Sequence, residues 1–546
     1  MTDRSSRSEG VDTGASPALA RGAALSTVAT AVSRATGFAR VVVVAAAMGT
    51  TFLANTYQTA NTAPNLVFEL VAAGVLTSIF VPTFVGYLVK EKRDEGWDAA
   101  NALTSVALVA LIALSLIVAF LAPAIMRVLT LGVGDESLRR EEIALGSRFL
   151  RLFSPQIALY GAGMIMTGAL HAHRRFVLPA VAPIFNNIVV IGVYVAYALM
   201  REPERPTVEG ITGGEVLLLG AGTTAGVLAM TVCLVPQLRR LGWRYRFHFS
   251  PSHPAVKKGA RLGLWALGYA GGYQAGLIVV LMLANKVEGG VAAYQWAFTF
   301  FYLPHALFAV PIFNVLFTAM SEHVARSEQQ QLVSRLDDGL SLLFFVLVPI
   351  GASLAALAIP LSRFTLQYGS MTQEGADLVA RVLLAFALGL PAYSAFLVFT
   401  RAFYATGDAR TPALVNAASV TVASVLGAIF FLQLPERWAV AGLALGHSIA
   451  FTAGAAVLAG WWRSRLGRTG SKPLARGTAR TIVLAALAYA VMAMLARNLP
   501  DDGTTSALVN VLVSATAGVI IYLAGSMALR APELDRIAAA FKRVRK

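Results

Sequence analysis

The sequence consists mainly of apolar runs, each close to the roughly 20 residues that an α-helix needs to cross the hydrocarbon core of a bilayer. The runs are residues 22–50, 64–88, 103–131, 143–171, 177–200, 216–234, 262–285, 291–320, 340–359, 378–404, 412–432, 438–461, 482–496 and 507–529. Charged residues make up only 14% of the 546 residues, against about a quarter in soluble proteins. We therefore predict an all-α polytopic membrane protein with about fourteen transmembrane helices.

The Lys and Arg residues predict the orientation in the membrane. An even number of spans puts both termini on one side, and most of the 45 Lys and Arg lie in the N-terminal tail and in every second connection. Because basic connections stay in the cytoplasm, we expect a multi-pass protein of the plasma membrane with both termini cytoplasmic. The net charge of +16 is then a topology signal that also attracts the anionic inner leaflet, and a nucleic-acid partner is not favoured.

The second half of the chain repeats part of the first. Residues 233 positions apart are identical at several places without a gap, including the pairs Arg148/Arg381, Tyr160/Tyr393, Thr167/Thr400 and Pro179/Pro412. Six helices separate the two copies, so the copies have the same orientation and are related by an axis along the membrane normal, as in many transporters.

The repeat predicts six regions along the chain. Two six-helix lobes, residues 22–236 and 259–463, are related by pseudo-two-fold symmetry and joined by a basic cytoplasmic linker, 237–258. Residues 464–530 hold two further helices, while residues 1–21 are a disordered polar tail and residues 531–546 a basic cytoplasmic tail.

Two arginines, Arg34 and Arg40, lie in the middle of the first apolar run, with Gly37 between them. A charged side chain near the bilayer centre costs roughly 2.5 to 3.5 kcal/mol on insertion scales, so it is tolerated where a polar cavity or an anionic partner receives it. Arginine holds phosphate with a planar fork and keeps its charge. Six residues separate the side chains by about 120° on a straight helix, and a bend at Gly37 would bring them together. We predict an anion site; the alternative is that both snorkel to the headgroup layer.

Other polar residues at membrane depth give further candidates. Asn55 and Asn65, in the segment expected to join the first two helices, are candidate substrate ligands. Glu69 is a candidate coupling carboxylate, with simple pairing to one of the arginines as the alternative. Arg148 and its repeat partner Arg381 are candidates for lining the substrate path, with snorkelling at the external helix ends as the alternative.

Glycines in the seventh run and one histidine have two readings each. Gly271 and Gly272 are hinge candidates for lobe movement, as is Gly37 in the first run, whereas close helix packing is the commoner reason for glycine in membrane helices. His447 is alone in its run, which favours a hydrogen-bonded packing role.

Several function classes are excluded by what the chain lacks. Cys233 is the only cysteine, so no disulfide within the chain and no cysteine metal cluster can form. The sequence contains no hydrolase, metalloprotease or phosphate-loop signature. We expect no cofactor, no metal site and no enzymatic activity.

Four motifs give the chain a resemblance to a known family. They are Ser33-Arg34-Ala35-Thr36-Gly37-Phe38-Ala39-Arg40, Ala63-Pro64-Asn65-Leu66 followed by Gly74 and Phe80-Val81-Pro82, Phe176 to Asn186 (FVLPAVAPIFN), and Phe403 to Pro412 (FYATGDARTP). The chain resembles the MurJ (MviN) family of lipid II flippases, within the multidrug/oligosaccharidyl-lipid/polysaccharide exporter superfamily. The resemblance covers essentially the whole chain after the N-terminal tail.

The resemblance implies a function for the candidate residues. Arg34 and Arg40 match the family's essential arginines and would contact the pyrophosphate of an undecaprenyl-linked peptidoglycan precursor. Residues 464–530 would form a groove for the lipid tail. Translocation to the outer leaflet would follow alternating access, driven by an ion gradient or the membrane potential, with a coupling cation and cell-wall synthesis proteins as possible partners.

The chain departs from the family at three places. Phe68 and Glu69 stand where many members have basic residues, Thr299 stands in place of an arginine, and Asn55 in place of an acidic residue. Two alternatives therefore stay open. One is an exporter of another lipid-linked oligosaccharide or a small molecule, and the other is a non-transporting scaffold for cell-wall enzymes.

Overall fold

The computed structural model describes residues 17–75, 93–201, 206–243, 245–252, 274–466 and 472–537, and every regular element in these ranges is a helix. The first half has α1 Pro17–Met48, α2 Phe52–Val75, α4 Arg93–Phe120, α5 Ala122–Leu129, α6 Glu136–Phe153, α7 Gln156–Ala172, α8 Val177–Met200, α9 Gly213–Val232 and α10 Val235–Arg240. The second half has α12 Gly290–Pro304, the π-helical turn η2 His305–Ala309, α13 Val310–Ala325, α14 Gln329–Ala356, α15 Ala358–Leu366, α16 Gln373–Ala387, α17 Leu390–Ala405, α18 Arg410–Gln433, α19 Glu436–Leu466, α20 Lys472–Asn498 and α21 Thr504–Ala528. The all-α prediction is confirmed.

The described residues contain ten helices that are long and apolar enough to cross a membrane, or eleven if the bent pair α16 and α17 counts as one span. The expected runs 64–88 and 262–285 lie only partly within the described residues. A shorter apolar helix, Gln274–Ala284, belongs to the second of these runs. The number fourteen therefore stays a prediction.

The second helix begins earlier than expected. The sequence predicted a joining segment up to residue 63, but α2 starts at Phe52 and contains Asn55, Asn61 and Asn65. Several of its polar side chains have hydrogen-bond partners in the helix or on neighbouring segments, although Asn61 Oδ1 has none within the described residues. Asn65 Nδ2, for example, donates to the carbonyl of Asn61 at 3.2 Å. Polarity was the wrong signal for a loop here, because a buried polar side chain with partners costs a helix little.

Two predicted helices are broken in the middle. Residues 143–171 form α6 and α7, separated at Ser154 and Pro155, and residues 378–404 form α16 and α17, which meet at 47°. Proline lacks the amide hydrogen and clashes with the preceding turn. Pro155 and Pro391 each lie at the start of the second segment, so the breaks follow from the sequence.

The internal repeat extends to element bounds and hydrogen bonds. α8 and α18 begin and end 233 residues apart. The turn that precedes each is closed by the same bond, from Arg175 N to Leu170 O at 2.9 Å and from Asp408 N to Phe403 O at 2.9 Å. The duplicated sequence therefore folds into a duplicated structure.

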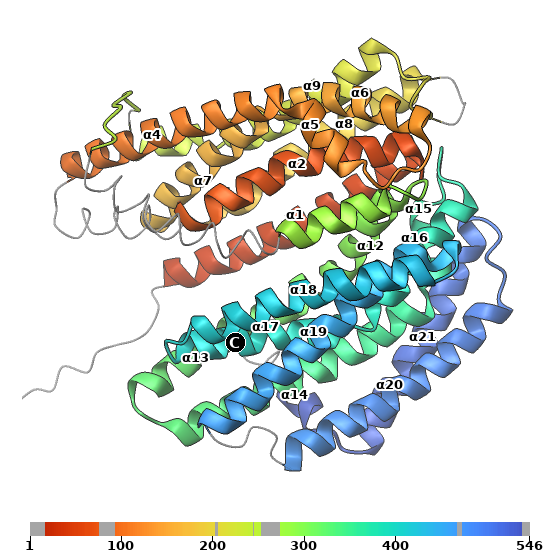
Figure 1. Ribbon diagram of the computed structural model, residues 1–546. Helices are drawn as coiled ribbons and strands as arrows, with labels where there is room; N and C mark the ends of the chain where they lie inside the picture. The colour runs from red at the N-terminus through yellow and green to blue at the C-terminus, as the bar shows by residue number, and fades with distance from the viewer. Residues whose placement is uncertain are drawn as a thin grey trace, which may run out of the picture.

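The helices gather in two groups (Figure 1). One group contains α2 and α4–α9, and the other contains α13–α19, with α20 and α21 along its outer side. The groups touch at the end where α1 stops and α2 begins. Residues 46–62 and 129–132 of the first lobe meet residues 282–295 and 369–375 of the second there. We call this region the lobe contact.

Asn55 provides three hydrogen bonds in the lobe contact. Its side chain is fully buried. Nδ2 donates to Val287 O at 2.9 Å, and Oδ1 accepts from Val291 N at 3.0 Å and Ala292 N at 3.4 Å. Asn55 thus caps the start of α12, which belongs to the other lobe.

Two backbone segments approach closely beside Asn55. Ser370 N donates to Ala46 O at 2.8 Å. A Cβ on Gly49, at φ +59°, would lie only 2.4 Å from the Ser370 carbonyl oxygen. Glycine is needed there for both conformation and space.

Ion pairs and hydrogen bonds link the final two helices, α20 and α21, to the second lobe at both ends. Arg363 of α15 makes two hydrogen bonds to Asp377 of α16, at 2.8 and 2.9 Å, and pairs with Asp501 of the α20–α21 connection at 2.8 Å. At the other end Glu533 pairs with Arg480 of α20 and accepts from Ser341 of α14 at 2.7 Å.

Candidate substrate cavity

A cavity of about 570 Å³ lies between the lobes. Its walls come from α1, α7, α8 and α12. The lining residues are Thr30, Ser33, Arg34, Gly37, Phe38, Arg40, Val41, Tyr160, Pro179, Ala180, Pro183, Asn186, Asn187, Phe298, Thr299, Tyr302 and Leu303. Both lobes contribute, so the shape of the cavity depends on how the lobes are arranged.

Arg34 and Arg40 both line this cavity. The Arg34 guanidinium lies over the ring of Tyr302, 5.5 Å from the ring centroid, at the distance of a cation–π contact. Within the described residues, no carboxylate forms an ion pair with either arginine. Two guanidinium groups in a cavity with no carboxylate among its lining residues make the cavity electropositive and suited to an anion.

Neighbouring helices fix the part of α1 that carries the arginines. Asn187 Nδ2 of α8 donates to Thr36 Oγ1 at 3.0 Å and to Ser33 O at 3.4 Å. On another face Phe38 makes an edge-on contact with Phe300 of α12, with ring centroids 4.9 Å apart. The helix is continuous through Gly37, so both arginines reach one cavity without a break there.

Sequence reasoning missed three polar residues of the cavity. Asn186 is nearly buried and its Oδ1 has no hydrogen-bond partner within the described residues, while Tyr160 and Tyr302 line the wall. The adjacent amides of Asn186 and Asn187 in an otherwise apolar run were the available signal, because such groups in membrane helices usually face a partner or a cavity.

Two of the departures from the family pattern fall at or near the cavity. Thr299 lines it, and its hydroxyl donates to Gln295 O within the same helix at 3.0 Å. Phe68 packs against the cavity residue Tyr160, with ring centroids 5.4 Å apart. Glu69 lies on α2, but its side chain is outside the described residues.

The other candidate ligands do not line this cavity. Asn55 is in the lobe contact, and Asn65 bonds within α2. Arg148 is exposed on α6, and Arg381 is half-buried on α16 with no hydrogen-bond partner for its Nε within the described residues. Gly271 and Gly272 lie outside the described residues.

A second, apolar cavity of about 490 Å³ lies between α14, α17, α19 and α20. Leu340, Phe344, Pro391 and Phe399 belong to its wall, and Leu474 and Ile482 of α20 contribute to one side. No residue of α21 lines it. This cavity is formed by α20 against the second lobe, and the lipid-tail groove expected for residues 464–530 stays a prediction.

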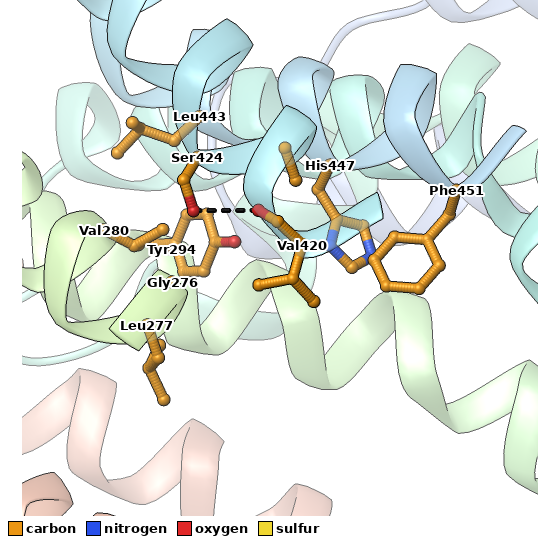
Figure 2. A pocket seen from close by; sticks show the side chains of 10 residues that line it. Gly276, Leu277, Val280, Tyr294, Val420, Ser424, Leu443, His447 and Phe451 are labelled. Carbon is orange, nitrogen blue, oxygen red and sulfur yellow. Dashed lines mark hydrogen bonds between the residues drawn. The ribbon is translucent and has the colours of Figure 1, made fainter. Parts of the chain in front are cut away.

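His447 lies at a small cavity of about 60 Å³ inside the second lobe, with Tyr294, Ser424 and Phe451 (Figure 2). Its ring centroid is 4.5 Å from that of Phe451. Nε2 of His447 has no hydrogen-bond partner within the described residues. The packing role is therefore supported, but the expected hydrogen bond at Nε2 is missing. Within the described residues no three His, Cys, Asp or Glu side chains are grouped to hold a metal ion.

Two helical lobes, with a cavity between them and a contact at one end, define the fold of a polytopic membrane transporter. Residues 44–514 match the model of the family described as "Lipid II flippase MurJ". The chain belongs to this family, and the resemblance inferred from its motifs is confirmed.

Individual relatives and solved structures agree with this assignment. A probable lipid II flippase MurJ of Rhizobium tropici is 28% identical over 427 residues, which cover 77% of this chain and 76% of that protein. One from Thermotoga maritima is 24% identical over 510 residues, 92% and 95% of the two chains. The fold is similar to that of a lipid II flippase MurJ in an inward closed conformation, with a TM-score of 0.75 and 20% identity over 93% of this chain and 99% of the other. It is also similar to an inward-facing multidrug resistance MATE family transporter, with a TM-score of 0.64 and 14% identity over 82% and 99%.

Proposed function

We propose that this chain moves a polyprenyl-pyrophosphate-linked peptidoglycan precursor from the cytoplasmic to the outer leaflet of a bacterial plasma membrane. The observation that carries the proposal is that two guanidinium groups, Arg34 and Arg40, line one cavity of about 570 Å³ and form no ion pair within the described residues. Relatives across the family are named for lipid II flipping, and the pyrophosphate of such a lipid is the anion that two arginines suit.

The arginines would neutralise the head group. A pyrophosphate entering a cavity of low dielectric needs charge compensation, and the planar guanidinium fork donates two parallel hydrogen bonds to phosphate oxygens. Tyr302 beneath Arg34 would hold that guanidinium in place, while Asn186 offers a further polar contact. No bond is made or broken, so the activity is transport and not catalysis.

The lipid tail would stay in an apolar environment throughout. The cavity between α14, α17, α19 and α20 has a mostly apolar wall, and residues 464–530 contribute to it through α20. Burying polyprenyl methylene groups there is favourable by about 0.8 kcal/mol per CH₂ relative to water. This supports α20 as an addition that serves a lipid substrate.

Transport would follow alternating access with both chain termini cytoplasmic. The lobe contact would close the external side in the conformation described, and separating it would open the cavity outward. The driving force would be an ion gradient or the membrane potential, worth about 2.3 kcal/mol per charge per 100 mV. Glu69 remains a coupling candidate, and cell-wall synthesis proteins remain candidate partners.

The test is transport by the purified chain in liposomes. A fluorescent lipid II is placed in the membrane, and quenching from outside measures how fast it exchanges between leaflets. We expect exchange that depends on the protein and is lost in Arg34→Ala. Equal exchange of a zwitterionic phospholipid would contradict selectivity for the anion. Exchange of a different pyrophosphate-linked oligosaccharide, but not of lipid II, would assign the chain to that other substrate.

A further inference from the structure

A carboxyl group is buried in the first lobe close to the lobe contact. Glu142 lies in the second turn of α6 and its side chain is fully buried. Its Oε1 lies 3.3 Å from Thr56 Oγ1 of α2, and Oε2 has no hydrogen-bond partner within the described residues. The proposed transport cycle does not use this group.

Counting hydrogens around Thr56 indicates the protonation state of Glu142. The Thr56 hydroxyl has a single hydrogen, and its oxygen lies nearer to the Phe52 carbonyl, at 2.9 Å, than to Glu142. A hydroxyl that donates to the carbonyl of Phe52 has no hydrogen left for Glu142. The contact between Thr56 and Glu142 is then a hydrogen bond only if the carboxyl group itself carries the proton.

Within the described residues, no charged group on the neighbouring helices forms an ion pair with Glu142. On α5 the basic residue, Arg127, is exposed. On α9 the Glu215 carboxylate caps its own helix, accepting from Thr212 N at 2.7 Å. On α2 the nearest titratable group is Tyr57, whose hydroxyl bonds to Tyr194 and Thr223.

The remaining charges lie elsewhere on the helices that pack against α6. The charged residues of α4 are confined to residues 93–98, at the opposite end of that helix, and Glu69 is more than three turns from Thr56 along α2. On α6 itself, Glu136 is mostly exposed and lies 3.8 Å from Arg139, while Arg140 is exposed and its Nε donates to Glu136 O. Glu141 is half-buried, and Arg148 and Arg151 are exposed. Burying an ionised carboxylate without a partner is so costly that the neutral form is favoured instead.

Glu142 is linked to the lobe contact through α2. Its partner Thr56 follows Asn55, which makes three hydrogen bonds to the second lobe. Thr59, one turn further, contacts Asn285 of the second lobe, whose Nδ2 lies 3.2 Å from the threonine hydroxyl. Movement of the first turns of α2 away from the second lobe would therefore alter the surroundings of Glu142.

We propose that Glu142 is a proton-binding site that couples the state of the lobe contact to pH. The closed contact holds the neutral carboxyl group, and separation of the lobes lets water reach it, so that it ionises. Because the closed conformation binds the proton more tightly, a lower pH favours closure. One such group changes the ratio of open to closed molecules by at most tenfold per pH unit. The inference rests on the alternating opening described under the proposed function, but not on the identity of the transported lipid.

The experiment measures the lobe separation directly. In a Cys233→Ser background, spin labels are attached at Gly134→Cys and Glu374→Cys, two exposed positions on opposite lobes near the contact. A Cβ at Gly134 meets no atom within 4 Å. Distances are recorded in lipid nanodiscs across about pH 5 to 9. We expect the fraction of separated lobes to rise with pH in the parent chain and to stay low and independent of pH in Glu142→Gln.

Two further variants make the result decisive. Glu136→Gln, which neutralises an exposed carboxylate on the same helix, is expected to keep the parent pH profile. Glu142→Asp keeps a carboxyl group on a shorter side chain and is expected to shift the profile along the pH axis, which provides a test even if Glu142→Gln does not fold. A parent chain without pH dependence, or either Glu142 variant with the parent profile, would overturn the proposal. A separation that follows sodium concentration at fixed pH would assign the site to a metal cation instead of a proton.

Discussion

At the scale of single residues, the proposed function rests on two arginines that form no ion pair within the described residues. Arg34 and Arg40 lie at a cavity that holds no carboxylate among its lining residues. Buried charges elsewhere in the described chain include paired ones, such as Arg363 with Asp377 and Asp501. The difference separates arginines that stabilise the fold from arginines that are available to a substrate.

Removing either cavity arginine should abolish transport. Truncating one side of a buried, hydrogen-bonded charge pair costs about 3 to 5 kcal/mol, so Arg34→Ala and Arg40→Ala should each lower activity at least about a hundredfold. Arg→Lys should restore part of it, because lysine keeps the charge and loses the planar fork. Growth of a strain with this chain as its sole flippase, with membrane levels checked, measures the effect. Full growth of both alanine variants would show that these arginines are not the anion site.

At the scale of elements, the repeat allows one turn to be compared with its copy. Gly407 and Arg174 lie 233 residues apart, each at the end of a helix, with φ of +80° and +58°. The left-handed conformation costs most residues about 1–2 kcal/mol but costs glycine little. The first lobe therefore tolerates strain that the second lobe avoids.

Substitutions at these two positions should have opposite effects. A Cβ at Gly407 meets no atom within 4 Å, so Gly407→Ala should destabilise the protein by the backbone cost alone, about 1–2 kcal/mol. Arg174→Gly should be neutral or stabilising by up to about 1 kcal/mol, because relief of strain is partly offset by the greater freedom of glycine in the unfolded chain. Thermal unfolding in detergent checks both. A stabilising Gly407→Ala would contradict the assignment of strain.

The same turn should show a pH-dependent stability. Asp408 accepts hydrogen bonds from the side chain of Thr411, at 2.6 Å, and from its backbone N–H, at 2.9 Å. These bonds, with a smaller effect from Arg465, hold the pKa of Asp408 below its ordinary value of 3.8. A lowered folded-state pKa gives stability that is present above 3.8 and is lost as the pH falls through the folded value.

Two Asp408 variants separate charge from capping. Asp408→Ala should cost about 1 kcal/mol near neutral pH, as for loss of a helix cap. Asp408→Asn keeps an acceptor but cannot ionise, so its difference from the parent should shrink as the pH falls below about 4. Unfolding curves at several pH values measure this. A difference that grows on acidification would show that the sign is wrong.

At the scale of the whole molecule, the proposed alternating access has the lobe contact open and close. The contact is narrow and includes backbone against backbone, with Ser370 N bonded to Ala46 O and Gly49 against the Ser370 carbonyl. A backbone contact of this kind cannot repack around an added group as a flexible side chain can.

A methyl group added at Gly49 should therefore destabilise the closed lobe contact and favour separated lobes. Gly49→Ala places a Cβ 2.4 Å from Ser370 O, which closure cannot accommodate. Weakening the contact by about 1.4 kcal/mol raises the open fraction tenfold, so a cysteine at Thr50, buried in the contact, should react with a maleimide about ten times faster. The labelling is measured in detergent on a chain that also carries Cys233→Ser, so that the cysteine at position 50 is the only one.

Gly407→Ala is the matched control for Gly49→Ala. Gly407 also has a left-handed backbone conformation, but a Cβ there meets no atom within 4 Å. It should leave the labelling rate unchanged. Equal acceleration by both variants would trace the effect to general destabilisation, and no acceleration by Gly49→Ala would show that the contact tolerates the methyl group.

The sequence by itself determined the features that depend on local chemistry and on periodicity. Apolar runs of membrane-spanning length require helices, Pro155 breaks one of them, and the identities 233 residues apart predicted the repeated helices. The cost of a charge in the bilayer identified Arg34 and Arg40 without any coordinates.

The tertiary structure alone decided which polar groups are partnered. Asn55 and Arg34 both appear in the sequence as polar residues in or near apolar runs. In the structure Asn55 is hydrogen-bonded between the lobes, whereas Arg34 lies over the face of Tyr302 and forms no ion pair within the described residues. Glu142 lay just outside an expected run and drew no attention, but α2 and α6 bury it completely. The physical reason is that solvation depends on groups brought together from distant parts of the chain, and a side chain's neighbours in sequence say little about its neighbours in space.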